Sequence, residues 1–260
     1  MKRRTPFLMI ILACALCAYA QSPRTGESSP KTKVTEKDVD PLALDVLRAV
    51  AQPVEQAHSF SFRALISEEE MASDDQIVTF FRSVDVTVQR PDKIRLILRG
   101  RGHLVDFYGG KGTVTMYAPD AKLYATVPAK DTIDASVAQL MAKGVDMPIG
   151  PFLRSDFYDL AVKSLVTGYV IGRVKLFDQD VHQLAFTAPD ADWQMWVVGG
   201  TNPRFVRVEI VNKKLEGKPR TIIQFLDWNL SPAIGANDFT FTKPADAHEI
   251  SMVPDTGGVK

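Results

Sequence analysis

From Ser59 onward, apolar and polar residues alternate with a period of two, which restricts most of the chain to β-strands. Short apolar-polar runs repeat at intervals of roughly 8–12 residues, as in antiparallel sheets. Turn-forming clusters separate these runs, for example at Arg90–Asp92 and Gly109–Gly112. A parallel sheet would need a helix between successive strands, and helical spacing is confined to two regions. The pattern predicts an antiparallel meander of about 11 strands with few helices, an α+β fold that is mainly β.

Helical spacing precedes the strands and returns once in their middle. Asp40 is suited to cap a helix that carries Pro41 in its first turn. We expect Pro53 to kink or end this helix at about Gln52. The second region covers about residues 131–165. One helical face there collects the apolar residues Ile133, Val137, Leu140 and Met141.

Composition predicts four parts along the 260 residues. Residues 1–20 combine a basic start, an apolar run and a small-x-small site, and are predicted to be a secretory signal peptide. Residues 21–39 are polar and predict a flexible leader, and residues 251–260 a disordered tail. Residues 40–250 would form a single domain with the 131–165 insert as a lid. Two domains with a boundary near 145–165 are the alternative, but neither half carries enough helix to cover its own apolar face.

The export signal sets the expected location and charge. Cleavage after Ala20 is favoured over acylation of Cys14, which follows a lipobox-like segment, so we expect a Gram-negative periplasmic protein. Without residues 1–20, the chain has 28 basic and 31 acidic residues, a net charge of −3, and no cysteine. A disulfide framework, a cysteine metal site and the basic surface typical of nucleic-acid binding are therefore excluded for the exported chain.

No pattern of catalytic residues stands out. The four histidines lack metal-binding spacing, and no G-x-S-x-G motif occurs, so we expect neither an enzyme nor a metal or cofactor site. The acidic run Glu68–Glu70 is interpreted as a solvated turn. Arg82 and Arg173 interrupt apolar strand faces, either as edge positions or as contacts for a lipid headgroup. Trp193 and Trp196 must face opposite sides of one strand, and the outward ring is either a partner surface or covered by the first helix.

A sheet of about 11 strands must curl, split or close, and the available helices are too small to fill a wide concave face. Two outcomes stay open: a concave sheet with an apolar cavity under a helical lid, or a solidly packed sandwich. If the cavity exists, we expect ten apolar side chains to line it. From the sheet these are Phe60, Phe62, Phe80, Leu96, Phe107 and Tyr117, and from the lid Leu140, Met141, Phe152 and Phe157.

Four stretches in order resemble the LolA-like superfamily of periplasmic lipoprotein carriers. They are Ser59–Phe62 after the first helix, Val88–Ile94 with its Arg-Pro hinge, the Tyr108–Tyr124 hairpin region, and a closing strand in Asp238–Pro244. Together they span about residues 41–250, and their sequence is most similar to the DUF2092 group of predicted periplasmic proteins. The resemblance implies an unclosed antiparallel half-barrel with a helical lid over a cavity for acyl chains. It also implies that Arg90 locks the lid through hydrogen bonds.

The sequence therefore predicts a monomeric, non-enzymatic binding or carrier protein for a lipid, a lipoprotein acyl chain or a similar amphiphile. Its partners would be the lipid or acylated protein and an inner- or outer-membrane protein. One alternative is an envelope-stress sensory or regulatory module that uses the same fold to bind a protein. Another is a protein that only scaffolds an envelope complex, with the cavity plugged.

Overall fold

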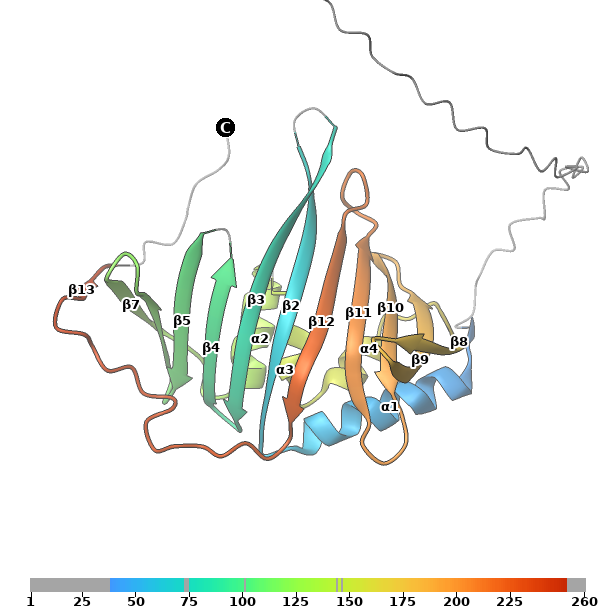
Figure 1. The fold of residues 1–260 in the computed structure, drawn as a ribbon, viewed down its shortest axis with the longest axis horizontal. Coiled ribbons are helices and arrows are strands. Elements are labelled where there is room, and N and C mark those ends of the chain that lie inside the picture. Colours follow the sequence, from blue (N-terminus) through green and yellow to red (C-terminus); the bar gives the residue numbers. More distant parts are fainter. Residues whose placement is uncertain (1–37, 73–74, 101, 144, 146, 252–260) are drawn as a thin grey trace, which may run out of the picture. The chain divides into compact units, whose positions relative to one another are not determined.

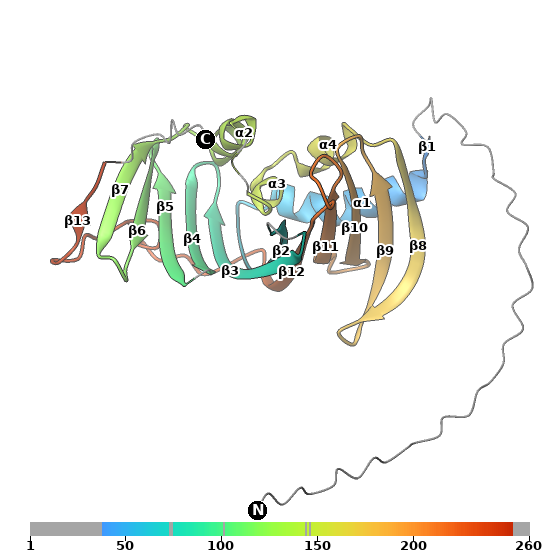
Figure 2. The same cartoon turned by 90° about the horizontal axis from the view of Figure 1, so that it is seen from above.

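In the computed structural model, the segments in which apolar and polar residues alternate form the strands of a single sheet, with helices on one face (Figures 1 and 2). The structure describes residues 38–72, 75–100, 102–143, 145 and 147–251. The predicted signal peptide, Cys14, most of the leader and nearly all of the tail lie outside these residues. The helices are α1 (Pro41–Gln56), α2 (Ile133–Ala142), α3 (Gly150–Leu153) and α4 (Phe157–Val162). The strands before α2 are β1 (Asp38–Val39), β2 (Ser59–Met71), β3 (Ile77–Gln89), β4 (Lys93–Gly100), β5 (His103–Gly110), β6 (Thr113–Ala118) and β7 (Leu123–Pro128). Those after α4 are β8 (Thr167–Leu176), β9 (Gln179–Thr187), β10 (Ala191–Val198), β11 (Arg204–Asn212), β12 (Arg220–Asn229) and β13 (His248–Glu249).

Eleven of the described strands, β2 to β12, form two antiparallel meanders that meet in the middle of the sheet. The strand order is β1-β8-β9-β10-β11-β12-β2-β3-β4-β5-β6-β7-β13, so the last long strand pairs with the first. This confirms the predicted unclosed antiparallel sheet and the preference for one sheet over two separate ones. Figure 2 shows the sheet curving around the helices, which all lie on its concave side.

Each edge of the sheet is capped by a two-residue strand that pairs in parallel. Asp38–Val39 pairs with β8, and His248–Glu249 pairs with β7. The first of these short strands lies where the sequence predicted the end of a flexible leader. Both occupy edge backbone groups that could otherwise pair with another chain.

Helix α1 begins as predicted but continues past its proline. The Asp40 carboxylate accepts a hydrogen bond of 2.9 Å from the Leu42 N–H, and Pro41 occupies the first turn. The expected end near Gln52 is wrong, because the helix runs on to Gln56 with Pro53 inside it. Burial of Val54 favours the added turn, and the Ala57 N–H closes it on the Pro53 carbonyl at 3.1 Å.

Two further sequence expectations are corrected. Glu68–Glu70 is not a turn but part of β2, where the Glu68 carboxylate is buried against the Arg82 guanidinium. The closing strand expected in Asp238–Pro244 is absent from this described segment, which forms turns and coil. The Phe241 ring instead packs among the rings of Tyr108, Tyr117 and Tyr124, with centroid distances of 5.7, 5.3 and 5.1 Å. Packing of the Phe241 side chain therefore holds this segment in place of the strand pairing that the sequence pattern predicted.

Replacing Leu47 by alanine tests how much α1 contributes to the sheet's cover. Leu47 is completely buried in the core, so Leu47→Ala should lower the free energy of unfolding by about 2–5 kcal/mol in chemical denaturation. Leu42 on the same helix is 56% exposed, and Leu42→Ala should change the free energy of unfolding by less than about 0.5 kcal/mol. Equal losses from the two substitutions would contradict this placement of α1.

Candidate functional site

The helices cover the concave face unevenly, and the uncovered volume is the candidate site. Helices α1, α3 and α4 pack over the half of the sheet around β11, β12 and β2. Over the other half, β3 to β7, α2, Val145 and residues 147–149 enclose a cavity of about 510 Å³. The structure thus combines the two outcomes left open by the sequence, a solid core and a cavity. This volume lies within the range of pockets for small molecules, roughly 300–1,000 Å³.

The cavity wall is built from side chains in register across the strands. Leu96, Phe107 and Met116 are direct cross-strand neighbours on β4, β5 and β6, and all three line the cavity. From the lid, Leu140 of α2 and Leu153 of α3 complete the lining. The remaining apolar lining comes from Ile66, Val84, Ile94, Leu98, Val114, Val127, Pro128, Ala129, Ile133, Val137, Val145, Met147, Pro148 and Ile149.

A glycine lets the wall close tightly at one point. A Cβ on Gly109 would lie 2.6 Å from the Ile94 Cγ2 atom, closer than real Cβ contacts come. The missing side chain therefore leaves room for Ile94, which itself lines the cavity. A larger residue at position 109 would push this part of the wall outward.

Three of the ten predicted lining residues, Leu96, Phe107 and Leu140, lie on the cavity wall. Four others lie in the solid half of the concave face instead. Phe152 stacks on Phe157 at 4.9 Å, and both rings contact Phe205 at 5.3 Å. Phe60 and Phe62 are buried beside Trp228, at centroid distances of 6.4 and 4.5 Å. Large rings fill the space that the sequence assigned to a ligand, because α3 and α4 insert into this half.

The last three predictions fail for reasons of register and exposure. Tyr117 follows the cavity residue Met116, and the period of two turns its ring to the outer face, where it packs on Phe241. Met141 is 39% exposed on α2. Phe80 belongs to the concave side of β3, but it lies beyond the described cavity lining.

The sequence analysis flagged Arg82 without deciding its role, and the structure places it on the cavity wall. Its Nε donates a 2.7 Å hydrogen bond to the Glu68 carboxylate, and its Nη2 forms an ion pair with the same oxygen. The other Glu68 oxygen, Oε1, is buried and has no hydrogen-bond partner within the described residues. Arg173, flagged alongside it, is exposed on β8. Arg82 is thus one of three charged residues, with Asp92 and Lys130, in a lining that is mostly apolar.

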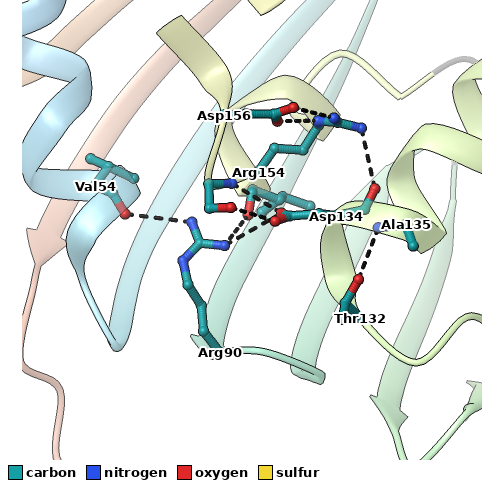
Figure 3. Close-up of polar contacts among 9 residues, drawn as sticks. Val54, Arg90, Thr132, Asp134, Ala135, Arg154 and Asp156 are labelled. Atoms are coloured by element: carbon teal, nitrogen blue, oxygen red, sulfur yellow. Dashed lines mark hydrogen bonds and ion pairs between the residues drawn. The ribbon is translucent and has the colours of Figure 1, made fainter. Parts of the chain in front are cut away.

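Arg90, at the end of β3, joins the helices on the concave side (Figure 3). Its Nη1 donates to the Leu153 carbonyl of α3 at 3.1 Å, and its Nη2 to the Val54 carbonyl of α1 at 3.5 Å. Nη1 also lies 3.6 Å from a carboxylate oxygen of Asp134 in α2. Burial lowers the pKa of the Arg90 guanidinium, while Asp134 acts in the opposite direction. One side chain thus contacts three of the four helices.

The same cluster ties α2 to the segment before α4. The Asp134 carboxylate accepts a 3.0 Å hydrogen bond from the Ser155 N–H and a second from the Ser155 hydroxyl. Arg154 donates to the Asp134 carbonyl at 3.2 Å and forms two 2.6 Å hydrogen bonds with Asp156 (Figure 3). These bonds from Arg154 lower the pKa of the Asp156 carboxyl although burial acts to raise it. We call Arg90, Asp134, Arg154, Ser155 and Asp156 the polar lock.

Sequence reasoning found Arg90 but missed its partners. Asp134 lies two residues after the helix cap Thr132, whose hydroxyl accepts from the Ala135 N–H at 3.1 Å, so an ordinary first-turn acid was the natural interpretation. Arg154 and Asp156 fall in a loop without periodicity. Met116 could have been found from the alternation with Val114, which also lines the cavity.

The described ranges contain neither a cluster suited to a metal ion nor a membrane-spanning helix. No group of three or more His, Cys, Asp or Glu residues there is arranged to hold a metal ion. None of the helices α1 to α4 is long and apolar enough to cross a membrane.

Comparison with known proteins identifies a family and a set of similar structures. A family model described as "Predicted periplasmic protein (DUF2092)" matches residues 43–253, whereas no curated protein matches the chain. LprF from Mycobacterium bovis is 16% identical over 80% of this chain and 99% of its own, with a TM-score of 0.47. The lipoprotein LppX from Mycobacterium tuberculosis is 14% identical over 75% and 100%, with a TM-score of 0.49. A LolA superfamily protein from Nitrosomonas europaea is 13% identical over 76% and 97%, with a TM-score of 0.32.

Removal of the Arg90 guanidinium tests the polar lock. Arg90→Leu should loosen the helices and raise the fluorescence of an added apolar dye, because carbonyls of α1 and α3 lose their donor. Arg173→Leu, an exposed change of the same type, should leave the dye signal unchanged. An unchanged signal in Arg90→Leu would remove Arg90 from the lock.

The lock should also weaken in acid. A lowered native pKa means that Asp156 stabilises the folded state above the ordinary aspartate pKa of about 3.9, and that this contribution is lost as the pH falls through the native value. Apolar-dye fluorescence should therefore rise below about pH 4. Asp156→Asn should already show a raised signal at neutral pH and a smaller change on acidification. Identical pH profiles for the two proteins would contradict a role of this carboxylate.

Proposed function

Because this chain belongs to the DUF2092 family of predicted periplasmic proteins, we propose that it binds an amphiphile with an acyl chain in the cavity under α2. The single observation that carries this proposal is the apolar cavity of about 510 Å³ between β3–β7 and the lid. The protein would act as a non-enzymatic, monomeric binding or carrier protein in a Gram-negative periplasm. Its ligand would be a lipid or the acyl chain of a lipoprotein.

The composition of the wall supports an apolar chain rather than a polar metabolite. Nineteen lining positions carry aliphatic, proline, methionine or phenylalanine side chains, namely the fourteen given above together with Leu96, Phe107, Met116, Leu140 and Leu153. Transfer of an acyl chain from water to such a wall is favourable by about 0.8 kcal/mol for each methylene buried.

Polar groups at the border of the cavity would receive the headgroup. Arg82, Lys130, Ser136 and Gln139 all contribute to the lining. The proposal therefore places the chain of the amphiphile along β4–β6 and its polar end toward these residues.

The polar lock would control access to the cavity. Helix α2 supplies both Leu140 to the lining and Asp134 to the lock, so movement of this helix would open the site and break the lock together. Arg90 would then act as the lid-locking residue that the sequence resemblance implied.

Blocking the cavity tests the proposed function. Met116→Trp places a large ring inside the wall and should abolish uptake of added fatty acid, as followed by native mass spectrometry. Thr115 lies on the opposite face of β6, where its hydroxyl contacts Thr126 at 2.9 Å, so Thr115→Trp is the matched control and should bind normally. Equal uptake by the two variants, or no uptake of fatty acid or phospholipid by the unaltered protein, would overturn the proposal.

A further inference from the structure

A second hollow lies on the face of the sheet opposite the helices. It has a volume of about 620 Å³ and extends over β11, β12, β2, β3 and β4 to the turn between β8 and β9. Its apolar lining residues are Leu65, Phe81, Phe177 and Ile222. We call this hollow the outer groove. It is separate from the cavity under α2, although Ile66 and Arg82 contribute to both.

Aromatic rings are unusually exposed in the outer groove. Phe81 is 72% exposed and Phe177 is 61% exposed. Leu65 on β2 lies between two polar cross-strand neighbours, Ser83 on β3 and Gln224 on β12. Exposed aromatic and arginine side chains are enriched where proteins bind other proteins. The groove has the composition of an interaction surface.

The backbone at Phe177 adds a second observation. Phe177 and Asp178 both have positive φ, 49° and 59°, in the tight turn between β8 and β9. Turns of this kind favour asparagine, aspartate or glycine, and a phenylalanine there is energetically unfavourable. Since the Phe177 ring is largely exposed, burial within this chain does not offset that cost. A ring that contacts a partner would explain its presence.

Charge indicates which partner fits. The groove lining contains no carboxylate, and the arginines that offer their guanidinium groups to it are Arg99 and Arg207, since buried Glu68 holds that of Arg82 on the concave side. Arg82 pairs with Glu68, and Arg99 shares Asp85 with Arg63. Arg207 lies over the Trp196 ring at 5.8 Å, and no ion pair of its own is present within the described residues. The surface is therefore suited to carboxylates.

From these contacts we propose that the outer groove binds an acidic segment of another protein that also carries apolar side chains. Arg207 and Arg99 would hold its carboxylates, while Phe81 and Phe177 would contact its apolar residues. The chain's own residues 21–37 are a poor occupant, because their charges are Arg24, Lys31, Lys33 and Lys37 against Glu27 and Glu36. Trp196, one of the two tryptophans singled out in the sequence, lies beneath Arg207 and would orient it.

The test uses a fluorescein-labelled peptide in which leucine and glutamate alternate, with a twin that has lysine in place of glutamate. Fluorescence anisotropy should show binding of the acidic peptide only, and binding should weaken as salt is added. Arg207→Glu should weaken it roughly tenfold or more, whereas Arg173→Glu, the same charge change on β8 outside the groove, should not. Equal binding of both peptides, or equal effects of both substitutions, would overturn the proposal.

A second variant separates binding from folding. Phe177→Asn removes the ring but suits the positive φ of the turn, so the variant should fold at least as stably and still lose peptide binding. Fatty-acid uptake by the cavity should be unchanged in it, which distinguishes failure at this groove from failure of the proposed function. Retained peptide binding in Phe177→Asn would contradict the proposal. Binding of phosphatidylglycerol vesicles without peptide binding would also overturn it, in favour of a lipid surface.

Discussion

The pairing of β12 with β2 joins two meanders that are distant in sequence, since Thr221 lies opposite Glu68 and Phe225 opposite Ala64. Without this ladder, each meander would be a separate curved sheet with an exposed apolar face. With it, one continuous concave surface forms, and every helix in the described residues packs on that surface. The positions of the cavity, the polar lock and the outer groove all follow from this shared sheet.

The cavity forms because fewer helices cover one half of the concave face than the other. Three helices and a cluster of rings fill the half near β12, where Phe62, Phe225 and Trp228 contact one another. Among the described residues, it is mainly α2, Val145 and residues 147–149 that cover the half near β5. Close packing in the first half gives a rigid support, while the second half retains space for a ligand.

Alternation was sufficient to predict the strands, the antiparallel class and the helical insert, because period two and period 3.6 are local properties. Membership of the family and the unclosed sheet were also predicted correctly. The cavity wall was predicted less well. Choosing Met116 rather than Tyr117 required knowledge of register, and placing Phe152 and Phe157 required knowledge of how α3 and α4 pack on the concave face. Such contacts depend on residues far apart in sequence, which a local pattern does not contain.

The connection between α2 and α3 has a consequence for how such proteins diversify. Residues 145 and 147–149 contribute four side chains to the cavity and belong to no strand. Insertions or substitutions in this connection can enlarge or reduce the volume of the cavity without disturbing the hydrogen bonding between any two strands. The size of the cavity can therefore evolve independently of the scaffold, so related chains with the same sheet can be expected to enclose cavities of different volume.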